Sequence, residues 1–234
     1  MKSQIDSCLP LLLSHIYHPA YMQQLLDLIV NVILIALDFD LTIIDIHSHG
    51  TWDNDNIHEL VEHVRPEILC LITESFKRGL HISVTSFSKQ EILINNVMKQ
   101  LLTQKVIPHL QQYQQVDGHN TSSKLDISTI RIPVFGGENY EEEDGKRKQL
   151  QRAMDDINKL NSSAHEHQNR QHEQNGHAQL VTPSSIMLID DNSHNIKMAR
   201  EDGYYSVLLD PESYGEVGVD NDDNKLFQSI IELL

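Results

Sequence analysis

The sequence has few cysteines, few basic residues and no long uninterrupted hydrophobic run. Two cysteines in 234 residues are too few for a disulfide framework. They are typical of a reducing compartment, so we expect a cytoplasmic protein. Eighteen basic residues stand against 34 acidic ones, which gives a formal net charge of −16. Such a charge repels phosphate backbones, so it argues against a nucleic-acid partner and favours a metal cation.

Two apolar stretches near the N-terminus lack the features of a membrane anchor or a signal peptide. No small-residue cleavage site follows residues 9–13, and residues 25–37 are interrupted by Asp27 and Asn31. The second stretch is also shorter than the ~20 apolar residues that span a bilayer. We therefore expect no membrane association, and residues 1–30 are predicted to be an N-terminal helical extension.

Apolar segments alternate with helical patterns through most of the remaining chain. The apolar segments are rich in β-branched residues, as strands covered on both faces are. The predicted strands are 31–37, 80–88, 130–135, 185–191 and 205–210, and the predicted helices are 56–79 (divided at Pro66), 90–102, 146–160 and 195–204. This alternation predicts one α/β domain over residues 31–234, a Rossmann-like three-layer sandwich around a parallel sheet.

One polar segment interrupts this pattern. Residues 161–181 contain almost no apolar side chains and many His, Gln and Asn residues, which predicts a disordered insertion. Its histidines have no cysteine partners of the kind that zinc sites use, so a solvated linker is the favoured interpretation; they are His165, His167, His172 and His177. The acidic run 141–144 is interpreted as a solvated loop.

Polar side chains gather where the predicted strands end. In a parallel sheet the ligand sits at the carboxyl ends of the strands, and these ends lie close together in space. The chemically useful groups at such ends, or at the start of a helix, are Asp38, Asp40, Thr85, Ser86, Lys146 or Lys148, Asp190 and Asp191. Crowded carboxylates repel one another unless a cation lies among them, and Mg²⁺ prefers such hard oxygen ligands.

The order of these motifs resembles that of the haloacid dehalogenase-like (HAD) superfamily of phosphohydrolases. The matching elements are DFDLT at 38–42, a strand ending in Thr85, a helix-opening lysine, and IDDNSHN at 189–195. The resemblance covers roughly residues 31–210. It implies that Asp38 is the nucleophile that becomes phosphorylated and that Asp40 is the general acid, then the base.

The same resemblance implies roles for the other strand-end residues. Thr85 and Ser86 would bind the phosphoryl oxygens, and Lys146 would neutralise their charge, with Lys148 as the alternative lysine. Mg²⁺ would be held by a set of aspartates, namely Asp38, Asp40, Asp190 and Asp191. Asn195 would help to orient the site.

The segment between the first two motifs bears on the substrate. Residues 43–79 are enough for a small flap (residues 43–52) and a helix, but not for a full cap domain. His47, His49 and Trp52 on the flap either contact substrate or pack the flap. By resemblance, the chain is a minimally capped magnesium-dependent phosphohydrolase that cleaves monoesters of a phosphoprotein or a small molecule. The alternatives are a phosphotransferase or phosphomutase with the same site, and a catalytically silent HAD-fold binding protein.

Overall fold

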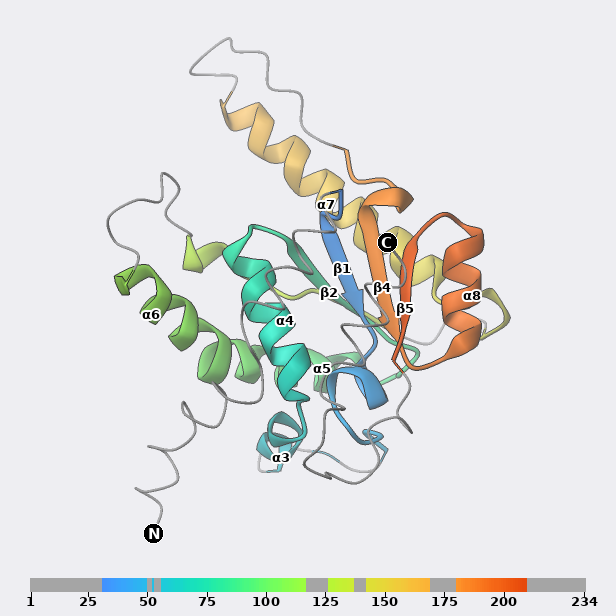
Figure 1. Ribbon diagram of the computed structural model, residues 1–234, viewed down its shortest axis with the longest axis horizontal. Coiled ribbons are helices and arrows are strands. Elements are labelled where there is room, and N and C mark those ends of the chain that lie inside the picture. The colour runs from blue at the N-terminus through green and yellow to red at the C-terminus, as the bar shows by residue number, and fades with distance from the viewer. Residues whose placement is uncertain are drawn as a thin grey trace, which may run out of the picture.

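The computed structural model describes a parallel five-stranded sheet with helices on both faces (Figure 1). The described residues are 31–49, 52, 56–116, 126–136, 142–168 and 180–209. The prediction for residues 1–30 lies outside them. The strands are β1 (Leu34–Leu37), β2 (His81–Thr85), β3 (Val134–Phe135), β4 (Ile186–Asp190) and β5 (Tyr205–Leu208), in the order β3-β2-β1-β4-β5.

Helices fill the connections between the strands. Between β1 and β2 the described residues form one wide turn, the flap and two helices, with no further domain, as predicted. The helical elements are η1 (Phe39–Ile43), α3 (Ile57–Glu62), α4 (Pro66–Lys77), α5 (Glu91–Leu101), η2 (Leu102–Val106), α6 (Ile107–Val116), η3 (Ile127–Thr129), η4 (Glu142–Asp144), α7 (Arg147–Gln168), η5 (Pro183–Ser185) and α8 (Ser193–Glu201).

Strand β1 shows why the sheet is the middle layer. Its residues are fully buried, and they alternate between two separate apolar cores. Ile35 and Leu37 pack into the core under α3, α4, α5 and α6, whereas Leu34 and Ala36 pack into the core under α7 and α8. A strand with both faces covered must be apolar at every position, which is the pattern the sequence carries. The predicted three-layer α/β sandwich is therefore confirmed.

Two helix boundaries follow from proline and glycine. The predicted helix 56–79 is divided as expected, because Pro66 occupies the first position of α4, where its missing N–H costs nothing. Gly79 adopts a left-handed φ of 73° just after α4 ends. The chain after α5, by contrast, stays helical through η2 and α6. The wide turn of η2 comes before Pro108 and accommodates its missing N–H.

Helix α7 is longer than the sequence predicts. The prediction ended it at residue 160, but it runs to Gln168 and so includes the first part of the segment 161–181. Residues 169–179 lie outside the described part of the chain. Polar composition suggested disorder, yet this stretch of α7 has neither Gly nor Pro to stop it. The hydroxyls of Ser162 and Ser163 donate back to the carbonyls of Asn158 and Lys159, both at 2.9 Å.

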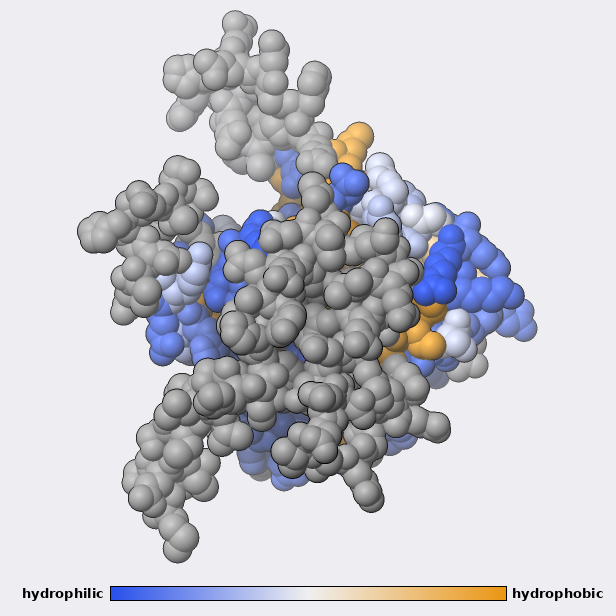
Figure 2. Space-filling view, in the orientation of Figure 1, coloured by the Kyte–Doolittle hydropathy of each residue, from blue (hydrophilic) through white to orange (hydrophobic). Residues whose placement is uncertain are grey.

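The visible surface of the described residues is mainly hydrophilic, notably over α6 and α8 (Figure 2). No helix in the described ranges has both the length and the apolar content needed to cross a bilayer.

The thiol of Cys70, on α4, is expected to react slowly. Burial raises its pKa to about 11, with a further increase from Glu74 and a partial opposing effect of Lys77. At pH 8 its thiolate fraction is then at least ~100-fold below that of an ordinary cysteine. In a Cys8→Ser variant, iodoacetamide should therefore modify Cys70 at least ~100-fold more slowly in the folded protein than in urea. Equal rates in the two conditions would contradict this assignment.

Candidate active site

The chain turns sharply after β1, immediately beyond Asp38. The backbone N–H of Ile44 donates to the carbonyl of Phe39 at 3.1 Å and closes η1 as one wide turn. Within it Leu41 has a left-handed φ of 58°, which costs a non-glycine residue roughly 1–2 kcal/mol. The buried Arg65 side chain supports this turn, because its Nε donates to the carbonyl of Leu41 at 3.3 Å. The first acidic motif therefore sits on a fixed, strained turn.

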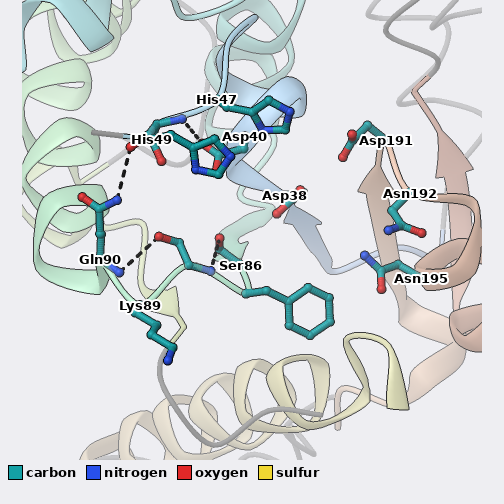
Figure 3. A pocket seen from close by; sticks show the side chains of 13 residues that line it. Asp38, Asp40, His47, His49, Ser86, Lys89, Gln90, Asp191, Asn192 and Asn195 are labelled. Atoms are coloured by element: carbon teal, nitrogen blue, oxygen red, sulfur yellow. Dashed lines mark hydrogen bonds between the residues drawn. The ribbon is translucent and has the colours of Figure 1, made fainter. Parts of the chain in front are cut away.

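A cleft of about 460 Å³ opens at the carboxyl ends of the strands. Its walls come from η1, the flap, the loop between β2 and α5, and the loop between β4 and α8 (Figure 3). Five of the sequence-predicted site residues line it, namely Asp38, Asp40, Ser86, Asp191 and Asn195. Segments far apart in the sequence thus meet in one cleft.

Three carboxylates converge beside this cleft. Oxygen atoms of Asp38, Asp190 and Asp191 all lie within 4.8 Å of one another. Asp190 is fully buried, whereas Asp38 and Asp191 are partly exposed. The Asp40 carboxylate is not part of this group among the described residues, and it accepts a hydrogen bond from the backbone N–H of Ser48 at 2.8 Å. The two aspartates of DFDLT therefore have different surroundings.

The lysine beneath the carboxylates is Lys146. Its side chain is 1% exposed, and its Nζ forms ion pairs with Asp38 and, at 2.8 Å, with Asp190. Nζ also donates to the carbonyl of Thr85 at 2.7 Å. Lys148, the alternative lysine, is 48% exposed and pairs with Asp144 at 3.4 Å. Of the two lysines, the structure brings Lys146 to the site and leaves Lys148 at the surface.

The ionisation of the cluster reflects burial and crowding. Burial raises the pKa of Asp38 to about 8; Lys146 opposes this shift and the charge of Asp190 adds to it. Burial, followed by the charge of Asp190, also raises the pKa of Asp191. Burial alone would lower the pKa of Lys146, but Asp190 and Asp38 outweigh it and raise that pKa. One buried ammonium thus leaves excess negative charge in the cluster, which a cation would offset.

Asp190 is fixed by the loop and helix that follow it. Its Oδ1 accepts the backbone N–H of Asn192 at 2.8 Å, and the Asn195 amide donates to both carboxylate oxygens at 3.0 and 3.1 Å.

Gly145, just before Lys146, has a left-handed φ of 55°, and a Cβ there would lie 3.0 Å from the Cβ of Met198. Glycine therefore allows the start of α7 to approach α8 closely.

The two predicted phosphate-binding residues at the end of β2, Thr85 and Ser86, differ in position. Ser86 lines the cleft and its hydroxyl accepts the backbone N–H of Ser88 at 3.1 Å. Thr85 is fully buried at the end of β2, and its hydroxyl has no hydrogen-bond partner among the described residues. Buried hydroxyls are rarely left without a partner, so this one is available to a ligand that reaches it.

Several residues of the cleft were missed by the sequence analysis. Ser48, Gln90 and Asn192 line it, and each is held by a hydrogen bond between a backbone atom and a side chain. The available signal was the N-cap preference of Asn192 at the start of α8, where its side chain accepts the N–H of His194 at 2.8 Å. Ser48 and Gln90 carry no comparable sequence signal.

Comparison with known proteins shows likeness only to distant solved structures. No family model matches the chain, and no curated protein matches it. Among solved structures, it is similar to a hydrolase of the haloacid dehalogenase-like family from Streptococcus pneumoniae, with a TM-score of 0.38 and 12% sequence identity. The alignment covers 76% of this chain and 84% of that one. Because this likeness is distant, the function proposed below rests on the residues of the cleft.

Proposed function

We propose that the protein is a magnesium-dependent phosphohydrolase that cleaves phosphate monoesters through a phosphorylated Asp38. The observation that carries this proposal is the cluster of Asp38, Asp190 and Asp191 around the buried Lys146, at the carboxyl edge of the parallel sheet. Carboxylates held this close need cations, and phosphoryl transfer needs the same positive charge. The motif order seen in the sequence supports the same reaction.

The donor set fits Mg²⁺. Mg²⁺ prefers carboxylate oxygens, and the oxygens of the three clustered aspartates lie within 4.8 Å of one another. Asp38, Asp190 and Asp191 would hold the ion, which when bound supplies positive charge to the phosphoryl oxygens. Asp40, the fourth predicted ligand, stays a prediction, because its carboxylate lies outside this cluster.

The proposed reaction proceeds in two displacements at phosphorus, the first by Asp38 and the second by water. Asp38 attacks phosphorus while the bond to the leaving oxygen breaks, and Asp40 gives its proton to that oxygen. A water molecule then attacks the phosphorus of phospho-Asp38, and Asp40 takes a proton from it. Inorganic phosphate leaves and the Asp38 carboxylate is restored. Lys146 neutralises charge beside Asp38 throughout, and the hydroxyls of Thr85 and Ser86 donate to phosphoryl oxygens.

The cleft supports the proposed substrate class, a phosphate monoester of a protein or of a small molecule. Because the described residues include only the small flap above it, the site admits either a phosphoprotein or a small phosphate ester. A phosphotransferase would use the same residues and would release little inorganic phosphate without an acceptor. A binding protein would keep the fold and turn over no ester at all.

Magnesium is expected to be required for turnover. With excess Mg²⁺ the purified protein should hydrolyse 4-nitrophenyl phosphate, and EDTA should reduce the rate by at least ~100-fold, because the phosphoryl charge would then meet uncompensated carboxylates. Release of 4-nitrophenolate and of inorganic phosphate should be measured together.

The two products separate the three functions. Equal amounts of both support hydrolysis, whereas nitrophenolate release that depends on an added acceptor supports phosphotransfer. No release from any ester supports the binding protein. Restoring activity by adding Mg²⁺ after EDTA is the control, and a rate unchanged by EDTA would overturn the proposed magnesium role.

A further inference from the structure

Ser48 links the flap to Asp40 and to the loop before α5. Its side chain is buried, whereas His47 and His49 on either side are exposed. The backbone N–H of Ser48 donates to Oδ1 of Asp40 at 2.8 Å. Its carbonyl accepts two side-chain donors, Nε2 of Gln90 at 3.2 Å and Nε1 of Trp52 at 3.1 Å. Both polar backbone groups of Ser48 are therefore held.

Gln90 brings a distant part of the chain to this point. It lies in the loop before α5, and its own backbone N–H donates to Oγ of Ser88 at 3.1 Å. The backbone N–H of Ser88 in turn donates to Oγ of Ser86 at 3.1 Å. Figure 3 shows the resulting series of hydrogen bonds, which runs from the β2 loop through Gln90 to the flap and Asp40.

From this series we infer that Gln90 is a positioning residue for Asp40, acting through the backbone of Ser48. The N–H and the carbonyl of Ser48 lie on either side of its Cα, so a hydrogen bond that restrains the carbonyl narrows the range over which the N–H can move. Because that N–H donates a hydrogen bond to Oδ1 of Asp40, the proton of the protonated carboxyl group is placed on Oδ2. Gln90 thus holds the carboxyl oriented for proton transfer. The inference rests on the proposed function, because it assumes that Asp40 protonates the leaving oxygen.

A comparison of substrates with different leaving groups tests whether Gln90 positions Asp40. An alkoxide is a poor leaving group that needs its proton from Asp40, whereas 4-nitrophenolate leaves without one. Loss of a positioned acid therefore slows alkyl phosphates far more than 4-nitrophenyl phosphate. A residue that only stabilised the fold would slow both esters alike.

The test compares kcat/KM for ethyl phosphate and 4-nitrophenyl phosphate with Mg²⁺ present. Gln90→Ala should lower the ethyl phosphate value by about tenfold, a part of the ~10²–10⁴-fold that a positioned general acid contributes. The 4-nitrophenyl phosphate value should change by less than about twofold. Gln90→Glu keeps the shape but loses the donor, so it should behave like Gln90→Ala, and Trp52→Phe should shift the ratio in the same direction.

The controls separate this inference from the proposed function. Asn95→Ala removes an exposed amide from α5, which within the described part of the chain donates to the carbonyl of Glu91 in its own helix, and should leave the hydrolysis of both esters unchanged. Asp40→Asn should show the same selective loss as Gln90→Ala, only larger. If Asp40→Asn is selective and neither Gln90 variant is, the inference fails and the function stands. If the wild type hydrolyses neither ester, both fail.

Discussion

Replacement of Asp38 by asparagine is expected to reduce kcat by about 10⁴-fold or more for every phosphate ester. Asparagine has nearly the same shape, but its amide forms no phosphorylated intermediate and brings no negative charge to the metal. Removal of an enzyme's covalent nucleophile characteristically has an effect of this size. The change should be measured as steady-state kcat, together with acid-quenched mass spectrometry of the wild type, in which the phosphoryl group should appear on the peptide containing Asp38.

The matched control is Asp45→Asn on the flap. Asp45 is exposed and pairs with His63 at 2.7 Å, so this variant loses a carboxylate close to the cleft but outside the cluster. Its activity should stay within about twofold of wild type, because exposed ion pairs contribute little. An Asp38→Asn variant that kept more than a few per cent of wild-type activity would overturn the assignment of the nucleophile.

The second large effect is expected on stability, from Lys146→Met. Methionine fills a similar volume but removes the buried cation shared by Asp38 and Asp190. Asp190 would keep its hydrogen bonds from Asn192 and Asn195 and lose its counter-charge. Breaking a buried ion pair from one side typically costs about 3–5 kcal/mol. The free energy of unfolding, measured with urea and without metal, should fall by that amount.

Lys148→Met is the matched control, since the same substitution two residues away removes only an exposed pair with Asp144. It should change the free energy of unfolding by no more than about 0.5 kcal/mol. Adding Asp190→Asn to Lys146→Met should recover part of the lost stability, because the uncompensated charge is then also removed. Equal effects of the two lysine variants would mean that Lys146 is not the counter-ion of the cluster.

The sequence was most informative where the fold depends on side-chain burial. β1 has two buried faces, so every residue must be apolar, and this is visible without a structure. Pro66 likewise marks a helix start by its chemistry alone. The predicted end of α7 was wrong because a polar composition indicates only that a segment is well solvated. A helix continues through its local backbone hydrogen bonds until a residue such as Gly or Pro ends it. β3 is only Val134–Phe135, shorter than its apolar sequence suggests.

In the candidate site, too, the side chains at strand ends could be predicted from the sequence, whereas contacts made by backbone atoms could not. Asp38, Asp190 and Asp191 could be grouped from the sequence because each lies at the end of a strand or just after it, and Lys146 was preferred over Lys148, which the structure leaves at the surface. The flap contacts were not found. Ser48 acts through its backbone N–H and carbonyl, which every non-proline residue possesses, so no side-chain pattern reports them. Leu41 was missed similarly, since leucine is not a residue that predicts a left-handed turn.

The close approach at Gly145 has a consequence for how the chain tolerates substitution. Any side chain there would have to adopt a left-handed backbone and also enter the space of Met198. Relief by a shift of α7 would move Lys146, the next residue, away from the carboxylates. Although Gly145 does not line the cleft, its substitution should therefore disturb the site, and a mutational scan should find it less tolerant than the exposed positions of α7.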